Sequence, residues 1–161
     1  MTATDIIETG RPIPRLASIR VTGPDSLEVH WAEGDRAGSV DLVDLAPVIG
    51  SYKVYRSLRG DAARFATAHL VEDGYAVAWS GVEVEMTSEL IAECAEETMD
   101  GSEFGLFLKR NRLTQEAAAA LLGRSRRQIA YYLKGGPIPR VVALACFGYE
   151  ALNEKRRVDA A

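Results

Sequence analysis

The sequence has few cysteines and histidines, two residue types that are common in catalytic and metal sites. Its 161 residues include two cysteines and two histidines. His30 and His69 have no second histidine at metal-ligand spacing, so neither a metal nor another cofactor is expected. Cys94 and Cys146 lie in apolar helical patterns and are expected to be buried, reduced thiols. No phosphate-binding glycine loop or nucleophile elbow occurs, so no catalytic residue is assigned and an enzyme is not expected.

Long apolar segments are also absent. No run of about 18 apolar residues occurs, so the sequence predicts no membrane-spanning helix. The start, "MTATDIIETGRPIPR", lacks a basic segment followed by an apolar core, so it does not resemble a secretory signal. We therefore expect a cytoplasmic protein, with residues 1–13 as an N-terminal tail.

Charge is distributed unevenly along the chain. Residues 1–100 carry 8 Lys/Arg and 18 Asp/Glu, a balance of −10, whereas residues 101–161 carry 11 and 5, a balance of +6. A polyanion would attract the second block and repel the first. Only the C-terminal third is therefore expected to meet nucleic acid, although uneven solubilising charge is the alternative.

Residues 14–99 have the pattern of a small α+β domain. "LASIRVT", "LEVHWA" and "GSVDL" alternate in polarity between turn-forming segments, which predicts an antiparallel sheet. Helical spacings follow: Asp41 is interpreted as a helix N-cap, and His69 ends a helical pattern. Ser80 and Gly81 are expected to form a two-residue hairpin connection. Thr87 or Ser88 is expected to cap a further helix.

Residues 102–154 are expected to be entirely helical, after a joint at residues 100–102. The last helix is expected over 140–153, and residues 155–161 are expected to be a frayed tail. The side chains placed to cap helices, and the glycine placed to end one, are Ser102, Thr114, Ser125 and Gly123.

Residues 115–134 carry the pattern of two helices that cross at a tight turn. Counting from Gln115, Ala119 is the fifth residue, where the helices cross and only a small side chain fits. Gly123 is the ninth, in the turn. Ile129 is the fifteenth and Tyr132 the eighteenth, and their spacing of three directs both toward the core.

This pattern resembles the helix-turn-helix of the lambda-repressor-like (Cro-type, xenobiotic-response-element) DNA-binding family, over about residues 103–153. The resemblance implies an all-α DNA-binding domain after the α+β domain, with double-stranded DNA as partner. The contact residues that it implies, by position, are Gln115, Ser125, Arg126, Arg127, Ala130 and Tyr131.

The outward residues of the second helix have the chemistry for such contacts. No acidic residue occurs between Glu116 and Glu150, whereas five basic residues do. Arg126 and Arg127 are the leading candidates for base contacts, because a guanidinium can bond guanine O6 and N7 together. Gln128 suits adenine. The candidates for phosphate contacts are Arg124, Lys134 and Arg140.

The N-terminal domain resembles a bacterial domain family of unknown function. The motifs are "LEVHWAEG" and "VDL", followed by the hairpin "WSGVEV", which is one residue shorter than the family's Trp-to-Gly spacing. The match covers about residues 14–98. Some members are joined to a repressor-like helix-turn-helix, and others occur near small toxin-like proteins, so the resemblance implies a fold and a context rather than a reaction.

Three functions follow from these patterns. The first is a sequence-specific transcriptional regulator, expected to be a homodimeric repressor. The second is an antitoxin-like protein whose N-terminal domain binds a small protein partner and whose DNA binding is autoregulatory. The third is an interaction domain whose helix pair no longer binds DNA, with the basic helix as a solvated face.

Overall fold

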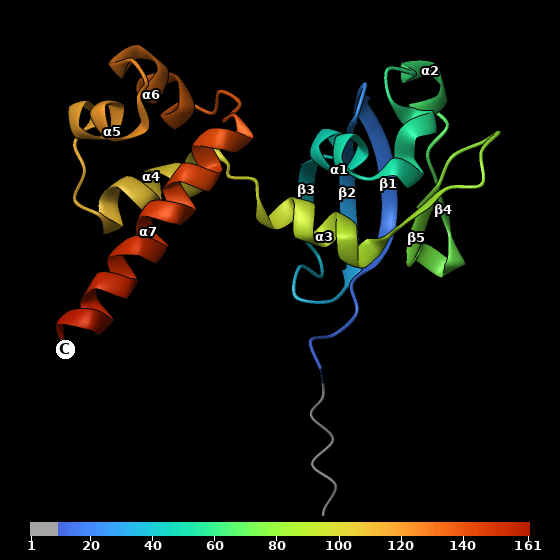
Figure 1. The fold of residues 1–161 in the computed structure, drawn as a ribbon, viewed down its shortest axis with the longest axis horizontal. Helices are drawn as coiled ribbons and strands as arrows, with labels where there is room; N and C mark the ends of the chain where they lie inside the picture. The colour runs from blue at the N-terminus through green and yellow to red at the C-terminus, as the bar shows by residue number, and fades with distance from the viewer. Residues whose placement is uncertain (1–9) are drawn as a thin grey trace, which may run out of the picture. The chain divides into compact units, whose positions relative to one another are not determined.

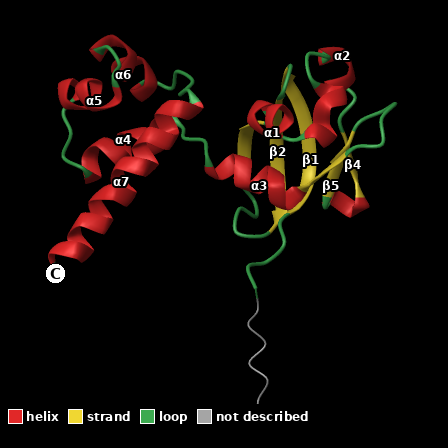
Figure 2. Cartoon of the chain, viewed as in Figure 1, coloured by secondary structure: helices red, strands yellow, loops and turns green. Residues whose placement is uncertain are grey.

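The protein is a mixed α and β chain with antiparallel sheets and several helices, described by a computed structural model over residues 10–161 (Figures 1 and 2). The first nine residues of the predicted tail lie outside the described residues. The chain divides into two compact units between Ala95 and Glu96. The strands of the described residues all lie in the first unit, and helices alone make up the second.

The first unit contains two three-stranded antiparallel sheets, ordered β1-β2-β3 and β4-β5-β6. The strands are β1 (Arg15–Gly23), β2 (Ser26–Glu33), β3 (Val40–Asp44), β4 (His69–Val71), β5 (Ala76–Ala78) and β6 (Glu85–Thr87). The helices are α1 (Ala46–Ser51), α2 (Ala62–Phe65) and α3 (Ser88–Glu96), with 3-10 turns η1 (Lys53–Leu58) and η2 (Glu72–Gly74).

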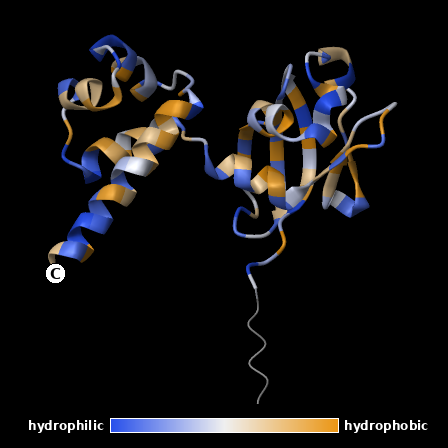
Figure 3. Ribbon diagram, in the orientation of Figure 1, coloured by the Kyte–Doolittle hydropathy of each residue, from blue (hydrophilic) through white to orange (hydrophobic). Residues whose placement is uncertain are grey.

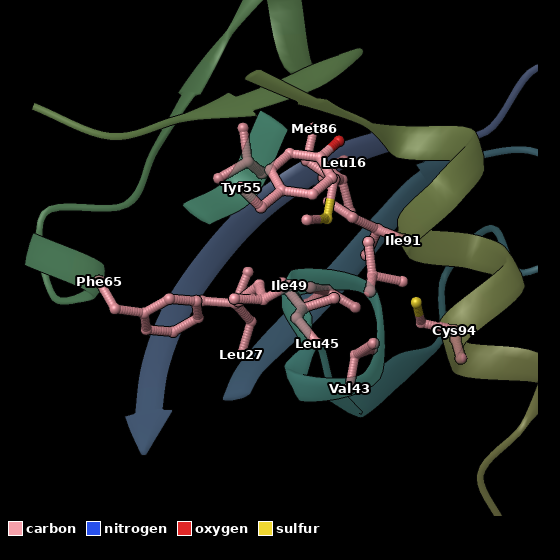
Figure 4. Packing of buried hydrophobic residues seen from close by; sticks show 14 of the residues in the cluster. Leu16, Leu27, Val43, Leu45, Ile49, Tyr55, Phe65, Met86, Ile91 and Cys94 are labelled. Carbon is pink, nitrogen blue, oxygen red and sulfur yellow. The ribbon is translucent and has the colours of Figure 1, made fainter. Parts of the chain in front are cut away.

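Alternation of polarity explains the larger sheet. In β2, Leu27, Val29 and Trp31 are buried, while the residues between them reach the opposite face. Figure 4 shows Ile91 and Cys94 of α3 pointing into the same core. One face of the sheet is therefore packed under helices, and the outer strand β3 leaves Leu42 on the exposed face.

Three local predictions in this unit were wrong. Asp41 is not a helix N-cap: it lies in β3, where its carboxylate accepts bonds from Trp31 Nε1 at 2.7 Å and Arg36 Nη1 at 2.9 Å. His69 begins β4 rather than ending a helix. Ser80 and Gly81 do not form a two-residue connection. Ala78 pairs with Glu85, so residues 79–84 connect β5 to β6, and Trp79 at the start of this connection is buried in the core.

The second unit contains four helices: α4 (Gly101–Arg110), α5 (Gln115–Leu122), α6 (Arg126–Leu133) and α7 (Arg140–Ala160). Phe104 and Phe107 are fully buried at its centre. Met99, expected at the end of the first domain, packs in this second core. Cys94 and Cys146 are buried and are not joined in a disulfide, as predicted. Burial raises the pKa of Cys146 to about 11, which keeps it protonated at neutral pH.

Two helix ends differ from prediction. Asp100, not Ser102, caps α4: its carboxylate accepts the Glu103 N–H, and Glu103 accepts the Asp100 N–H in return. This reciprocal pair satisfies two free amides, which a serine inside the helix does not do. The helix α7 continues to Ala160 instead of fraying after Asn153, because no glycine or proline interrupts it there. One predicted cap is confirmed, because the Thr87 hydroxyl accepts the Leu90 N–H at 3.3 Å.

Within the described residues, no helix is both long enough and apolar enough to cross a membrane.

Gly74 provides a test of the first unit. Its φ is 93°, and an added Cβ would overlap the carbonyl oxygen of Leu16. Replacing Gly74 with Ala is therefore expected to lower the free energy of unfolding by more than about 1–2 kcal/mol, since left-handed strain and a steric clash combine. Urea denaturation measures this change.

Gly50 is the matched control, because a Cβ there meets no atom within 4 Å and its φ is not left-handed. Gly50→Ala is expected to leave stability unchanged or raise it by about 0.5–1 kcal/mol. Equal losses in the two variants would contradict the close approach at Gly74.

Candidate nucleic-acid interface

The turn between α5 and α6 forms as the sequence predicted. Thr114 caps α5, its hydroxyl accepting the Ala117 N–H at 3.1 Å. Gly123 ends the helix with a φ of 61°, and its N–H bonds to Ala119 O. Ala119 O also accepts the Arg124 N–H at 2.9 Å. These local bonds fix how α6 leaves α5.

The first turn of α6 is closed by a reciprocal cap. The Ser125 hydroxyl accepts the Gln128 N–H at 3.1 Å, and the Gln128 side-chain oxygen accepts the Ser125 N–H at 3.0 Å. The predicted cap at Ser125 is confirmed. The same geometry engages the amide oxygen of Gln128, so only its NH₂ group is left to donate to a base.

One face of α6 packs inward. Ile129 is fully buried, and Tyr132 is 4% exposed and meets the Phe104 ring edge-on at 5.7 Å. Both inward positions are as predicted. Ala119, expected where the helices cross, is half-buried, and the fully buried alanine of α5 is Ala118.

The opposite face of α6 is exposed and basic. Arg126, Arg127 and Lys134 are exposed, as are the side chains of Ser125 and Gln128. Among the described residues, Arg127 and Lys134 have no acidic partner at ion-pair distance. The arrangement presents cations and amide donors from a single helix face, which suits phosphates and base edges.

Three other predicted DNA-contact residues differ in their surroundings. Tyr131 is 55% exposed, and its ring lies so close to Gly136 that an added Cβ there would overlap it. Its ring thus lies against the turn after α6. Ala130 and Gln115 are half-buried.

Two of the predicted phosphate contacts are partly enclosed. Arg140 is paired with Glu97, and its Nε is buried. Arg124 is half-buried, with a buried Nε that has no partner among the described residues. Neither guanidinium is as open as that of Arg127.

One acidic side chain also lies on this surface, and the sequence patterns did not indicate it. The Arg126 guanidinium lies 2.8 Å from Glu116 Oε1, with side chains that are 69% and 62% exposed. Glu116 is the second residue of α5, and Arg126 is the first of α6. Their proximity depends on how the two helices cross, and no spacing in the sequence reveals it.

A hydrogen-bonded clasp joins the C-terminal end of α4 to α7. Arg110 binds both oxygens of Glu150, at 3.0 and 3.1 Å, and Asn111 Nδ2 donates to Glu150 at 2.8 Å. The bond from Arg110 lowers the pKa of Glu150 below its usual value, against the opposing effect of burial.

The two histidines of the first unit lie outside any metal-binding cluster that the described residues form. Within residues 10–161, no group of three His, Cys, Asp or Glu side chains is placed to hold a metal ion. His30 Nε2 lies 3.3 Å from Glu28 Oε1, and the His69 ring bonds to Thr67 O. Both imidazoles thus have local partners.

Comparison with known proteins adds little. No protein-family model matches the chain, and no match to it was found among the curated proteins. One similar solved structure is a crystal structure named "Putative DNA Binding Protein" from Nitrosomonas europaea, with 29% identity over 86% of this chain and 87% of that one. Its TM-score of 0.41 is too low for the folds to be treated as equivalent, so neither its fold nor its binding is transferred to this chain.

Protonation of Glu150 provides a test of the clasp. Because its folded pKa is lowered, its contribution to stability is present above the unfolded value of about 4.3 and is lost as pH falls through the folded pKa. Glu150→Gln is expected to lower the melting temperature at pH 7 by a few degrees, with a smaller difference once the pH falls below the lowered pKa of Glu150. Thermal denaturation across this pH range measures the effect.

Glu154→Gln is the control, because the Glu154 side chain is 68% exposed and its ion pair with Arg157 on the same helix is long, at 3.6 Å. It removes the same charge from α7 and is expected to change little. If Glu150→Gln lowered the melting temperature equally at every pH, the ionised Glu150 carboxylate would not be the origin of the stabilisation.

Proposed function

We propose that this protein is a sequence-specific DNA-binding transcriptional regulator, a dimeric repressor whose helix α6 enters the major groove. The observation that carries the proposal is the two-sided character of α6. Ile129 and Tyr132 are buried, while Arg126, Arg127 and Lys134 are exposed on the other side. A helix held rigidly by one face can present the other to base edges.

Charge supports the same proposal. The balance of +6 in residues 101–161 contrasts with −10 in residues 1–100. A polyanion releases counterions when it binds clustered cations, and it is repelled by an acidic block. DNA binding therefore belongs to the second unit, with the first left for an effector or a protein partner.

The residues divide into two roles in this proposal. Arg127 and Arg126 are the base-reading residues, because each can make a bidentate bond to guanine. Lys134 is assigned to phosphates, since its exposed ammonium acts as a point charge. Arg124 and Arg140 have only secondary roles in phosphate binding, because both are partly enclosed.

Binding of the protein to its own promoter tests the proposal. Arg126→Ala/Arg127→Ala is expected to reduce discrimination against a scrambled duplex by about 1–3 kcal/mol for each arginine that no longer bonds a guanine. Fluorescence anisotropy with promoter and scrambled duplexes, at two salt concentrations, measures both affinity and its salt dependence.

Lys155→Ala/Arg156→Ala is the matched control, because it removes two exposed cations from the C-terminal half of α7. This variant is expected to keep its preference for the promoter. Equal binding by wild type and the Arg126/Arg127 variant, or no binding by wild type, would refute the regulator as proposed.

Exposed apolar residues on α7 support a second copy as partner. Val141 is 62% exposed, Leu144 41% and Leu152 46%, and their spacing places them on one side of the helix. Figure 3 shows that hydrophobic residues concentrate in the first half of α7. Gly148 lies between them, and an added Cβ there meets no atom. Two copies of α7 crossing near Gly148 would cover these side chains, and a two-fold dimer would read half-sites about 34–36 Å apart.

The antitoxin-like alternative is favoured by one feature of the first unit. The strand β3 is at the edge of its sheet, and its exposed Val40 (52%) and Leu42 (63%) are unusual on an unprotected edge. Strand addition by a small protein partner would pair this edge and cover both side chains. DNA binding would then serve autoregulation.

Two pairs of substitutions separate these surfaces. Light scattering coupled to size-exclusion chromatography is expected to give twice the 17.5 kDa chain mass for wild type and for Val40→Lys/Leu42→Lys. Leu144→Lys/Leu152→Lys is expected to give the monomer mass, because lysines at this face cannot be buried together.

A dimer that survives the α7 substitutions would contradict the proposed interface. Loss of the dimer only in the Val40/Leu42 variant would place self-association on the sheet edge. Co-expression with the product of a neighbouring short reading frame addresses the alternative: a complex that requires Val40 and Leu42 would support the antitoxin-like function.

A further inference from the structure

Glu116 occupies an unusual position on the basic surface. It is the sole acidic residue between Glu103 and Glu150 in the sequence. Its carboxylate nevertheless lies 2.8 Å from Nη1 of Arg126, the first residue of α6. Both side chains are more than half exposed, and such pairs contribute little to stability. A role in holding the fold therefore does not account for this carboxylate.

The geometry leaves the other edge of the Arg126 guanidinium open. Nη1 is bound to Glu116, whereas Nε and Nη2 lie on the adjacent edge of the same planar group. A guanine offers O6 and N7 to two parallel donors. Arg126 can thus meet a guanine with this edge while keeping Glu116 on Nη1.

The pair of Arg126 and Glu116 interacts differently with a phosphate group. It can use the same open edge of the guanidinium, but its negative charge then lies close to the Glu116 carboxylate on Nη1. The two anions repel each other, whereas the O6 and N7 edge of a guanine carries no net charge. Unlike Arg127 and Lys134, Arg126 is therefore restrained from backbone contacts.

We propose that Glu116 is a specificity-determining residue, which positions Arg126 for guanine and penalises its binding to phosphates. This inference rests on the proposed DNA-binding function. It is a case of specificity obtained by weakening the wrong complex rather than by strengthening the right one. The cost is a lower affinity for DNA of any sequence, which a regulator searching a long polyanion tolerates.

Glu116→Gln tests this role, because it keeps the shape of the side chain and removes its charge. Its affinity for a random-sequence duplex is expected to rise several-fold. The slope of log K against log salt is expected to steepen by about 0.9, the value for one added phosphate contact. Preference for a duplex enriched by in vitro selection over the random duplex is expected to fall by a similar factor.

Glu154→Gln is the control for charge alone, since Glu154 is also an exposed partner of an arginine but lies on α7. It is expected to leave the salt slope unchanged. In an Arg126→Ala background, Glu116→Gln is expected to have no further effect on the slope, because no guanidinium remains to be released.

Two results would overturn the inference while leaving the proposed function intact. One is a wild-type protein that binds DNA, with equal salt slopes for the Glu116 and Glu154 variants. The other is a steeper slope that persists without Arg126, which would reduce Glu116 to a general charge. No binding of any duplex by wild type at low salt would remove the proposed function and this inference together.

Discussion

Burial of Ile129 and Tyr132 against the aromatic core of the second unit is the constraint on which the candidate interface depends. The Phe104 ring meets Tyr132 edge-on and is stacked with the Phe107 ring, with 6.2 Å between the two phenylalanine ring centroids. Apolar burial of this kind is the dominant favourable term in folding, and it leaves α6 a single orientation. Because the inward face is settled in this way, the positions of Arg126 and Arg127 in solvent follow from helical periodicity.

The ends of the helices add a second layer of constraint. Free amides at a helix start must be satisfied, and Thr114, Ser125 and Asp100 do this for three successive helices. The left-handed Gly123 then sets the direction in which the chain enters α6. A rigid scaffold of this kind allows long, exposed arginines to be presented with little backbone freedom, which is what recognition of a base edge needs.

Local features were predictable from the sequence to the extent that their causes are local. The caps at Thr114 and Ser125 and the turn at Gly123 depend on residues within a few positions, and all were found as expected. Asp41 was misassigned because its partners, Trp31 and Arg36, approach it through strand pairing. The cap of α4 was placed two residues late, since serine and aspartate are both good caps and only the backbone path distinguishes them.

The sequence by itself determined the charge segregation, the apolar side of α6 and the chemistry of its polar side, because these follow from composition and from a period of about 3.6 residues. Only the tertiary structure decided which cations are free. Glu97 encloses Arg140, and Glu116 holds Arg126, whereas Arg127 stays open. The physical reason is that an ion pair depends on a distance of a few ångströms between side chains on different helices, and that distance is set by how those helices pack.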